Sequence, residues 1–326
     1  MREISVKEIT EVLQRVAARL FNEGLEMFIG YESGSGLAKA RPFFAAAQEE
    51  TAALVFNPFC VHNLAKYLVR FPKAKIAVVV KGCDSGAVER LVRERNLDRT
   101  KITVIGVPCG GMLAREKVMA ELPQDAEITT VTDRRDAFVL QTSKDERVLD
   151  KKAYLLEKCL TCSQNNPVGV DLMLGKEAPP VGEPGKDPFA RLKEISALAP
   201  PARAAFWDRL MKRCLRCYAC REVCPACSCT ECCFEQAVPG WQKGATWLSK
   251  AITLSDNYHY HLIRAFHAAG RCTGCGECER VCPVRIPLML LNKKLAGDVE
   301  ELFGPAPPDA PSALYTYSAG DKDEFS

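Results

Sequence analysis

The sequence predicts two domains, an N-terminal α/β domain with a mostly parallel sheet and a mainly α-helical domain after it. Three observations lead to this fold class. In the first half, short apolar runs alternate with stretches of helical periodicity, which is typical of a parallel sheet covered by helices. Residues 177–188 are rich in proline and glycine, so neither a helix nor a central strand can continue through them. Beyond this linker, apolar residues recur mainly at helical spacing.

The first domain, residues 1–176, has elements that follow from the spacing of apolar residues. A helix is predicted over residues 5–23, because apolar residues recur there three and four positions apart: Val6, Ile9, Val12, Leu13, Val16 and Leu20. Strands are predicted where apolar runs are short, at residues 25–31, 52–57, 75–80 and 101–107. Further helices are predicted at residues 60–69 and 85–96.

The second domain, residues 189–304, is predicted to contain helices at residues 189–198, 202–212, 258–269 and 288–303. The remaining segment, residues 305–326, is rich in Pro, Ser and Asp. We expect it to be mobile, or ordered only against a partner.

Composition narrows the function classes. The balance of 44 basic and 41 acidic residues carries no signal for binding a polyanion, so nucleic-acid binding is disfavoured. No apolar run approaches the roughly 20 residues that cross a bilayer. The chain has 17 cysteines, and its first residues are charged and amphipathic rather than a secretory signal. We therefore expect a cytoplasmic protein of an anaerobic organism whose thiols bind metal instead of forming disulfides.

One cysteine pattern, C-x2-C-x2-C-x3-C-P, occurs twice in the second domain. The first copy contains Cys214, Cys217, Cys220 and Cys224, and the second contains Cys272, Cys275, Cys278 and Cys282. This is the bacterial ferredoxin pattern, in which three cysteines bind one [4Fe–4S] cluster and the fourth ligates the other cluster. A zinc site is the alternative, but zinc knuckles pair two C-x2-C units and seldom need a third evenly spaced thiolate. Two complete copies favour two iron–sulfur clusters.

The two copies lie far apart, and the predicted helix at residues 258–269 falls between them. In this respect the domain resembles the α-helical ferredoxins of succinate dehydrogenase iron–sulfur subunits and of the small subunit of heterodisulfide reductase. The resemblance implies that the fourth cysteines cross over. One cluster would then be held by Cys214, Cys217, Cys220 and Cys282, and the other by Cys272, Cys275, Cys278 and Cys224.

A second group of cysteines belongs to the first domain, where Cys60, Cys83 and Cys109 each follow a predicted strand. If these strands are parallel, the three cysteines emerge at the carboxyl edge of the sheet, where α/β proteins bind ligands. Cys60 and Cys83 also precede or begin predicted helices, and a helix N-terminus stabilises thiolates. For any one of these cysteines alone, a small buried residue is the better explanation. Together with a C-x2-C pair they predict a third [4Fe–4S] cluster, held by Cys83, Cys109, Cys159 and Cys162.

Four more cysteines follow the first ferredoxin pattern closely: Cys227, Cys229, Cys232 and Cys233. Exposed thiols are liable to oxidation, so such a group calls for an explanation. One is a fourth [4Fe–4S] cluster with the ligands Cys60, Cys227, Cys229 and Cys232. Others are a site completed by a partner chain, or thiols that pack against the first cluster. The sequence leaves these alternatives open.

Three motifs of the first domain carry a resemblance to a known family. They are residues 81–85 (Lys-Gly-Cys-Asp-Ser), 105–110 (Ile-Gly-Val-Pro-Cys-Gly) and 56–64 around Cys60. With the two ferredoxin patterns, they make the chain similar to the β-subunits of coenzyme F420 hydrogenases and formate dehydrogenases. Relatives of this kind include iron–sulfur proteins associated with heterodisulfide-reductase-like complexes. The resemblance implies electron transfer between a flavin or F420 site and iron–sulfur carriers.

The chain departs from F420-dependent members of that family near its N-terminus, where they carry a longer flavin-binding stretch. The nearest candidate here is the short segment 30–36, which contains Gly30, Gly34 and Gly36. A glycine-rich loop after a strand can hold the phosphate of FAD or FMN, but it is more often a plain turn. We therefore predict an electron-transfer subunit that works between a partner's flavin and another redox subunit. The alternatives are a reductase with its own flavin, linked to F420 or NAD(P)H, and an iron–sulfur sensor or scaffold.

Overall fold

The computed structural model of this chain describes residues 6–95, 97–134, 136–182, 187–229, 232–234 and 252–304. The chain forms two compact units, Met1–Asp187 and Pro188–Ser326, which we call unit 1 and unit 2. The predicted terminal segment 305–326 lies outside the described residues, and so do residues 183–186 of the predicted linker.

Unit 1 is built on a five-stranded sheet with the strand order β2-β1-β3-β4-β8. Its strands are β1 (Met27–Ser33), β2 (Ala40–Ala45), β3 (Ile76–Val80), β4 (Ile102–Gly106) and β8 (Leu172–Met173). Strands β1, β3, β4 and β8 run parallel to their neighbours, and only β2 is antiparallel. All five residues of β3 are buried, as expected for a central parallel strand. The predicted α/β fold with a mostly parallel sheet is confirmed.

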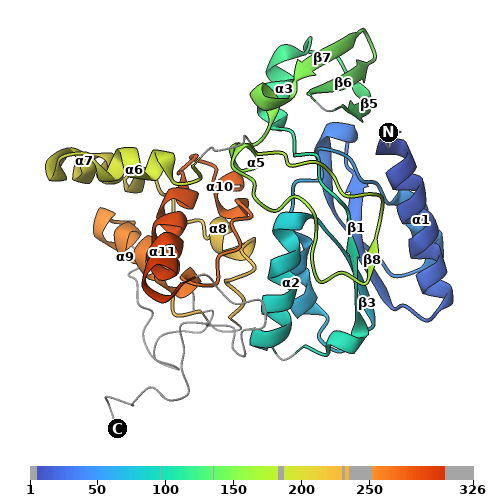
Figure 1. Cartoon of the computed structure of the whole chain (residues 1–326), viewed down its shortest axis with the longest axis horizontal. Coiled ribbons are helices and arrows are strands. Elements are labelled where there is room, and N and C mark those ends of the chain that lie inside the picture. The colour runs from blue at the N-terminus through green and yellow to red at the C-terminus, as the bar shows by residue number, and fades with distance from the viewer. Residues whose placement is uncertain are drawn as a thin grey trace. The chain divides into compact units, whose positions relative to one another are not determined.

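Helices cover this sheet on both sides. Figure 1 shows α1 (Val6–Asn22) and α2 (Gly82–Arg95) on opposite sides of it. Helix α2 follows β3 and leads to β4 through the short η4 (Arg99–Lys101). The core of unit 1 is large and apolar, and it includes Leu13 of α1, Val78 of β3 and Leu91 of α2. This core fixes the carboxyl edge of the sheet, where two of the predicted cysteines lie.

Two predicted elements of unit 1 are wrong. Residues 52–57 form no strand. Residues 48–53 form the 3₁₀ helix η2 (Gln48–Ala53), and Leu54 after it forms only an isolated bridge, to Glu32. The Glu50 carboxylate accepts hydrogen bonds from the amides of Ala46 and Ala47, which favours this local turn over sheet pairing. The helix predicted from residue 60 is instead the 3₁₀ helix η3 (Leu64–Arg70), because the Asn63 side chain caps it by accepting from Ala65 N.

Unit 1 also contains an antiparallel three-stranded sheet that the apolar pattern did not predict. It consists of β5 (Ile128–Asp133), β6 (Ala137–Thr142) and β7 (Glu146–Asp150), in that order. Short helices flank it: α3 (Arg115–Glu121), α4 (Lys151–Tyr154) and α5 (Glu157–Leu160). The strands escaped prediction because the outer two are polar and largely exposed on one face.

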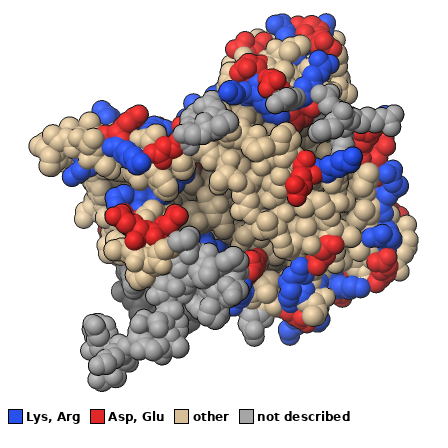
Figure 2. All heavy atoms as spheres, in the orientation of Figure 1, with Lys and Arg blue, Asp and Glu red and all other residues tan. Residues whose placement is uncertain are grey.

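Charge is unevenly spread over unit 1. Figure 2 shows few charged side chains over the middle of this unit, where Figure 1 draws β8 and the segment beside it. Val168 and Met173 are more than a third exposed in this part of the chain. A surface poor in charge with exposed apolar side chains is typical of the centre of a protein contact.

Unit 2 is mainly helical, as predicted. Its helices are α6 (Ala190–Ser196), α7 (Pro200–Met211), α8 (Ala219–Glu222), α9 (Leu254–Ala268), α10 (Glu277–Arg280) and α11 (Leu288–Phe303). Its core is small and mixes cysteines with apolar residues such as Leu210, Tyr260 and Ile286. Within the described parts of both units, no helix is long and apolar enough to cross a membrane.

Candidate iron–sulfur sites

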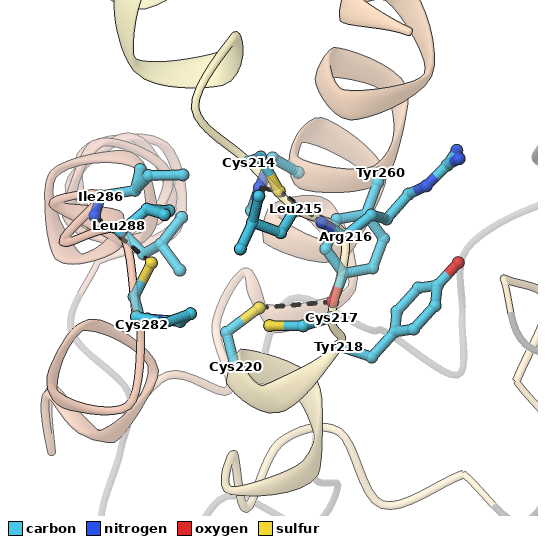
Figure 3. A pocket seen from close by; sticks show the side chains of 13 residues that line it. Cys214, Leu215, Arg216, Cys217, Tyr218, Cys220, Tyr260, Cys282, Ile286 and Leu288 are labelled. Carbon is cyan, nitrogen blue, oxygen red and sulfur yellow. Dashed lines mark hydrogen bonds between the residues drawn. The ribbon is translucent and has the colours of Figure 1, made fainter. Parts of the chain in front are cut away.

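Four cysteines of unit 2 surround one cavity of about 20 Å³. They are the predicted ligands of the first cluster: Cys214, Cys217, Cys220 and Cys282. Figure 3 shows Cys282 entering from the opposite side to Cys217 and Cys220, so the four sulfur atoms enclose a common space. Apolar side chains complete the wall, among them Leu215, Ile286 and Leu288. The cysteine from the second pattern therefore joins the first three, as the crossover implies.

The sulfur atoms of this cavity already have hydrogen-bond donors. The backbone amide of Arg216 donates to Cys214 Sγ at 3.3 Å, and that of Ile286 donates to Cys282 Sγ at 3.3 Å (Figure 3). Two side chains of α9 face the same sulfurs. The Tyr260 hydroxyl lies 3.3 Å from Cys220 Sγ, and His261 Nε2 lies 3.2 Å from Cys214 Sγ. Donors aimed at sulfur stabilise thiolate ligands and tune a cluster's potential.

Burial works against thiolates at this site until a metal cluster binds them. Burial raises the pKa of Cys214, and the Arg216 amide opposes this shift. Burial likewise raises the pKa of Cys220, opposed by the Arg264 guanidinium and the Tyr260 hydroxyl. Burial and the positive charge of Arg264 lower the pKa of His261 to about 4, so its imidazole is neutral near pH 7. A cluster that supplies iron to the sulfurs would remove this penalty.

The two ferredoxin patterns share one backbone path. Arg216 and Tyr218 have φ values of 48° and 60°, and the equivalent residues of the second pattern, Gly274 and Gly276, have 68° and 70°. A left-handed backbone costs a residue with a side chain about 1–2 kcal/mol. Each loop then enters a short helix, α8 or α10. The left-handed conformation thus recurs at matching positions, with strain only in the first pattern, and it fits a loop that wraps a cluster.

The second predicted set, Cys272, Cys275, Cys278 and Cys224, also lies together. The Cys278 thiol, on α10, interacts electrostatically with each of the other three. Burial raises its pKa, and the Arg264 guanidinium opposes the shift. Asn292 of α11 points its Nδ2 at Cys278 Sγ at 3.5 Å, while its Oδ1 is buried without a hydrogen-bond partner. The structure thus brings both crossover sets together. That these eight cysteines ligate clusters remains a prediction.

A buried cation lies between the two sets. Arg264 of α9 is 3% exposed, and one of its terminal nitrogens donates to Cys220 O at 3.0 Å. Burial disfavours the charged guanidinium, but the thiols of Cys224, Cys227, Cys278 and Cys220 outweigh burial and raise its pKa. Its Nε has no hydrogen-bond partner among the described residues. This environment fits anionic clusters on both sides of the side chain.

Within the described ranges, no group of three or more His, Cys, Asp or Glu side chains is arranged to hold a metal ion. A zinc ion would require its thiolates at about 2.3 Å from one point.

Unit 1 brings the other predicted set close together. Cys83 is the second residue of α2 and Cys109 lies three residues beyond β4, at equivalent positions of two parallel strands paired Val80 to Gly106. The Cys83 thiol interacts electrostatically with Cys109, and Cys109 with both Cys159 and Cys162. Burial, with a smaller contribution from Cys159, raises the pKa of Cys109 to about 12.

Backbone contacts explain how distant segments meet at this point. Gly111 N donates to Cys109 Sγ at 3.4 Å, and Met112 N donates to Cys159 Sγ at 3.5 Å. Two neighbouring amides of one loop therefore donate hydrogen bonds to two of the thiols. Asn165 holds the segment after Cys162 against the same loop, since its carbonyl accepts from Cys109 N at 3.0 Å. A Cβ on Gly82 would lie 2.3 Å from the Gln164 carbonyl, so only glycine lets this segment approach α2.

The cysteines predicted for a fourth cluster are distributed differently. Cys60 is fully buried in the apolar core of unit 1, and its sulfur accepts from Asn57 N at 3.3 Å. Burial raises its pKa to about 12. In unit 2, Cys227 hydrogen bonds with the Cys224 thiol, and Cys233 interacts with Cys232 and Cys229. Cys60 does not follow a strand, contrary to the sequence expectation, because the strand before it is absent.

The glycine-rich segment 30–36 is part of an antiparallel hairpin. Gly30 lies within β1, and the loop beyond it leads through η1 (Leu37–Lys39) into β2 rather than into an α-helix. The loop closes on itself: Gly34 N donates to Lys39 O at 3.0 Å and Lys39 N donates to Gly36 O at 2.9 Å. These bonds use the amides that a phosphate would need, which favours the plain turn.

Three residues near the cysteines were not singled out from the sequence: Tyr260, Arg264 and Asn292. Tyr260 and Arg264 are four residues apart and therefore share one face of α9. The helix predicted at residues 258–269 places these two side chains on one face, but nothing in the sequence indicates which face of the helix contacts the cysteines.

Comparisons with known proteins agree with this geometry. Residues 210–286 match the 4Fe-4S dicluster domain family. The chain is 25% identical over 297 residues to the F420-dependent formate dehydrogenase subunit beta of Methanocaldococcus jannaschii, covering 75% of this chain and 76% of that protein. It is 22% identical over 349 residues to the F420-dependent formate dehydrogenase 1 subunit beta of Methanococcus maripaludis, with 88% of each protein covered.

Among solved structures, the chain is similar to one chain of the F420-reducing [NiFe] hydrogenase complex from Methanosarcina barkeri. The TM-score is 0.40 at 14% sequence identity, and the match covers 49% of this chain and 63% of the hydrogenase chain, less than two thirds of its length. The sequence relatives and the dicluster domain confirm the resemblance inferred from the motifs. The chain is similar in sequence to F420-dependent formate dehydrogenase β-subunits, and residues 210–286 match a domain family for two [4Fe–4S] clusters.

Proposed function

We propose that this chain is the iron–sulfur subunit of a cytoplasmic, anaerobic complex of the F420-dependent formate dehydrogenase or hydrogenase type. In that role it relays single electrons between a partner's flavin site and another redox subunit, of which a heterodisulfide-reductase-like subunit is one predicted kind. The names of the sequence relatives support the type of complex. The gathering of Cys214, Cys217, Cys220 and Cys282 around one cavity is the observation that carries the electron-transfer role.

The eight cysteines of the two ferredoxin patterns are the proposed ligands in unit 2, in the crossover arrangement. A bound [4Fe–4S] cluster accepts and releases one electron at a time. The protein binds the cluster through its thiolates and sets its potential. Amides of Arg216 and Ile286 stabilise the ligand sulfurs, and the buried side chains of Ile286 and Leu288 exclude water from one wall of the cavity.

A third cluster in unit 1, held by Cys83, Cys109, Cys159 and Cys162, extends the proposed relay. Its support is the mutual interaction of the four thiols and the two amide donors from one loop. Burial and then the Asp84 carboxylate raise the pKa of Cys83, and Lys158 and Lys81 each lower it by less. Lys81 is paired with Asp84 at 2.7 Å, so Lys158 is the nearby positive charge that favours an anionic cluster at this edge of the sheet.

Iron stoichiometry after anaerobic reconstitution tests both proposals. Two clusters require about 8 irons per chain, three require about 12, and a fourth at Cys227, Cys229 and Cys232 would raise this to about 16. We expect about 12. The double variant Cys83→Ser/Cys109→Ser should lose about four irons and keep the EPR signals of both unit 2 clusters.

The matched control is Cys60→Ser, a buried thiol of the same unit outside the proposed set, which should keep its iron. A fully reconstituted wild-type chain with only about 8 irons would contradict the third cluster. A chain that holds none would overturn the electron-transfer function. A flavin absorbance in the isolated chain would favour the reductase alternative.

A further inference from the structure

Arg264 is a buried cation of unit 2 that belongs to neither proposed ligand set. Its side chain comes from the middle of α9 and is almost completely buried. Its only hydrogen bond to a described residue is the one from a terminal nitrogen to Cys220 O, at 3.0 Å. No described carboxylate forms an ion pair with it, although buried charges in proteins are as a rule paired.

The neighbours of Arg264 belong to both cysteine sets. Cys220 is in the first set, and Cys224 and Cys278 are in the second. Its helix neighbours on the same face, Tyr260 and His261, contact Cys220 and Cys214 of the first set. The guanidinium therefore interacts with cysteines of two sites, and it is negative charge on their sulfur atoms that offsets the cost of burying its own charge.

We propose that Arg264 is a positioning residue shared by the two clusters, whose positive charge stabilises the reduced state of each. When a [4Fe–4S] cluster takes up one electron from a reductant, the cluster and its thiolates gain one negative charge. A fixed cation beside the ligands favours that state, because the surroundings are shielded from water. Arg264 thereby raises both reduction potentials and offsets its own burial.

The effect is larger at the second cluster. Of the four thiols that interact with Arg264, Cys224 and Cys278 belong to that set, Cys220 belongs to the first set and Cys227 belongs to neither. The guanidinium also contacts the first set through a carbonyl rather than a sulfur. Loss of the charge should therefore lower the potential of the second cluster more than that of the first. The difference in potential between the two clusters, which drives electron transfer from one to the other, should change as a result.

The experiment is an EPR-monitored redox titration of the reconstituted full chain, with dithionite as the reductant. The variants are Arg264→Gln, which removes the charge, and Arg264→Lys, which keeps it. Arg209→Gln is the control, because Arg209 is an exposed cation on α7 of the same unit. For Arg264→Gln we expect at least a tenfold fall in the reduction equilibrium constant of the second cluster, about 59 mV for a one-electron couple. The first cluster should shift less in the same direction, and Arg264→Lys should restore most of both shifts.

Two results would overturn the proposal. One is an Arg264→Gln protein that holds both clusters at wild-type potentials. The other is a shift in Arg209→Gln as large as in Arg264→Gln, which would mean that net charge alone matters. If Arg264→Gln fails to retain its clusters, Arg264→Lys decides: retention in the lysine variant supports a need for the charge, and loss in both overturns it.

This inference rests on the proposed ligand sets, and the two can fail separately. The iron content and the number of EPR signals of the wild-type chain test the clusters. The potentials of the variants test Arg264.

Discussion

The residues closest to the proposed ligands differ in how they contact sulfur. Arg216 and Ile286 use backbone amides, which any residue at those positions would supply. Tyr260 and His261 use side chains, so their contribution depends on residue identity. Side-chain donors are therefore the part of the site that substitution can test without changing the fold of the loop.

Tyr260→Phe removes the hydroxyl beside Cys220 Sγ and keeps the ring, which packs edge-to-face against Tyr218 and Phe234. We expect the potential of the first cluster to fall and that of the second to stay unchanged, because a hydrogen bond to a ligand sulfur stabilises the reduced cluster. The control is Tyr258→Phe, whose hydroxyl donates to Asp208 at 2.7 Å and not to a thiol. Equal shifts in both variants would contradict a role for the sulfur contact.

At the scale of elements, the start of α2 positions one edge of the unit 1 site. The parallel pairing of β3 with β4 sets Cys83 and Cys109 side by side, and the segment around Gln164 and Asn165 packs against Gly82. Ser85 Oγ accepts from Val168 N at 3.2 Å, which holds the same segment to α2. The third set thus depends on a close approach between backbones rather than on the cysteines alone.

Gly82→Ala tests that approach. Its Cβ would lie 2.3 Å from the Gln164 carbonyl, so the segment that carries Cys162 must move away from Cys83. We expect loss of about four irons with both unit 2 clusters intact. Gly24→Ala is the control: its added Cβ meets nothing within 4 Å, and although the φ of +84° strains the backbone there, it should keep all the iron because it moves no cysteine segment. A Gly82→Ala protein with full iron content would contradict this placement of the third cluster.

At the scale of the whole molecule, the two units differ in what holds them together. Unit 1 has a large apolar core that includes the central strands, and its proposed cluster lies at the edge. The small core of unit 2 includes Cys214, Cys220 and Cys278 themselves. Metal binding that organises a core contributes directly to folding, so unit 2 depends on its clusters far more than unit 1 does.

Removal of iron with a chelator should therefore unfold the two units unequally. We expect amides of α7, α9 and α11 to exchange hydrogen at least tenfold faster in the iron-free chain, while those of β3 and β4 stay protected. Hydrogen exchange read by mass spectrometry measures both regions in one sample. Equal protection of unit 2 with and without iron would show that its fold does not rely on clusters.

The sequence alone determined the cysteine patterns, the α/β and helical halves and the parallel strands 75–80 and 101–107, because these signals are local in spacing and periodicity. It also carried the resemblance that the relatives confirm. Only the tertiary structure decided that Arg264 is buried beside cysteines of both sets, and that the Gln164 carbonyl packs closely against Gly82. It also decided that the predicted strand at 52–57 is instead the end of a 3₁₀ helix followed by a single bridge. The physical reason is the same in each case: burial and backbone approach depend on segments far away in the chain, which no local pattern contains.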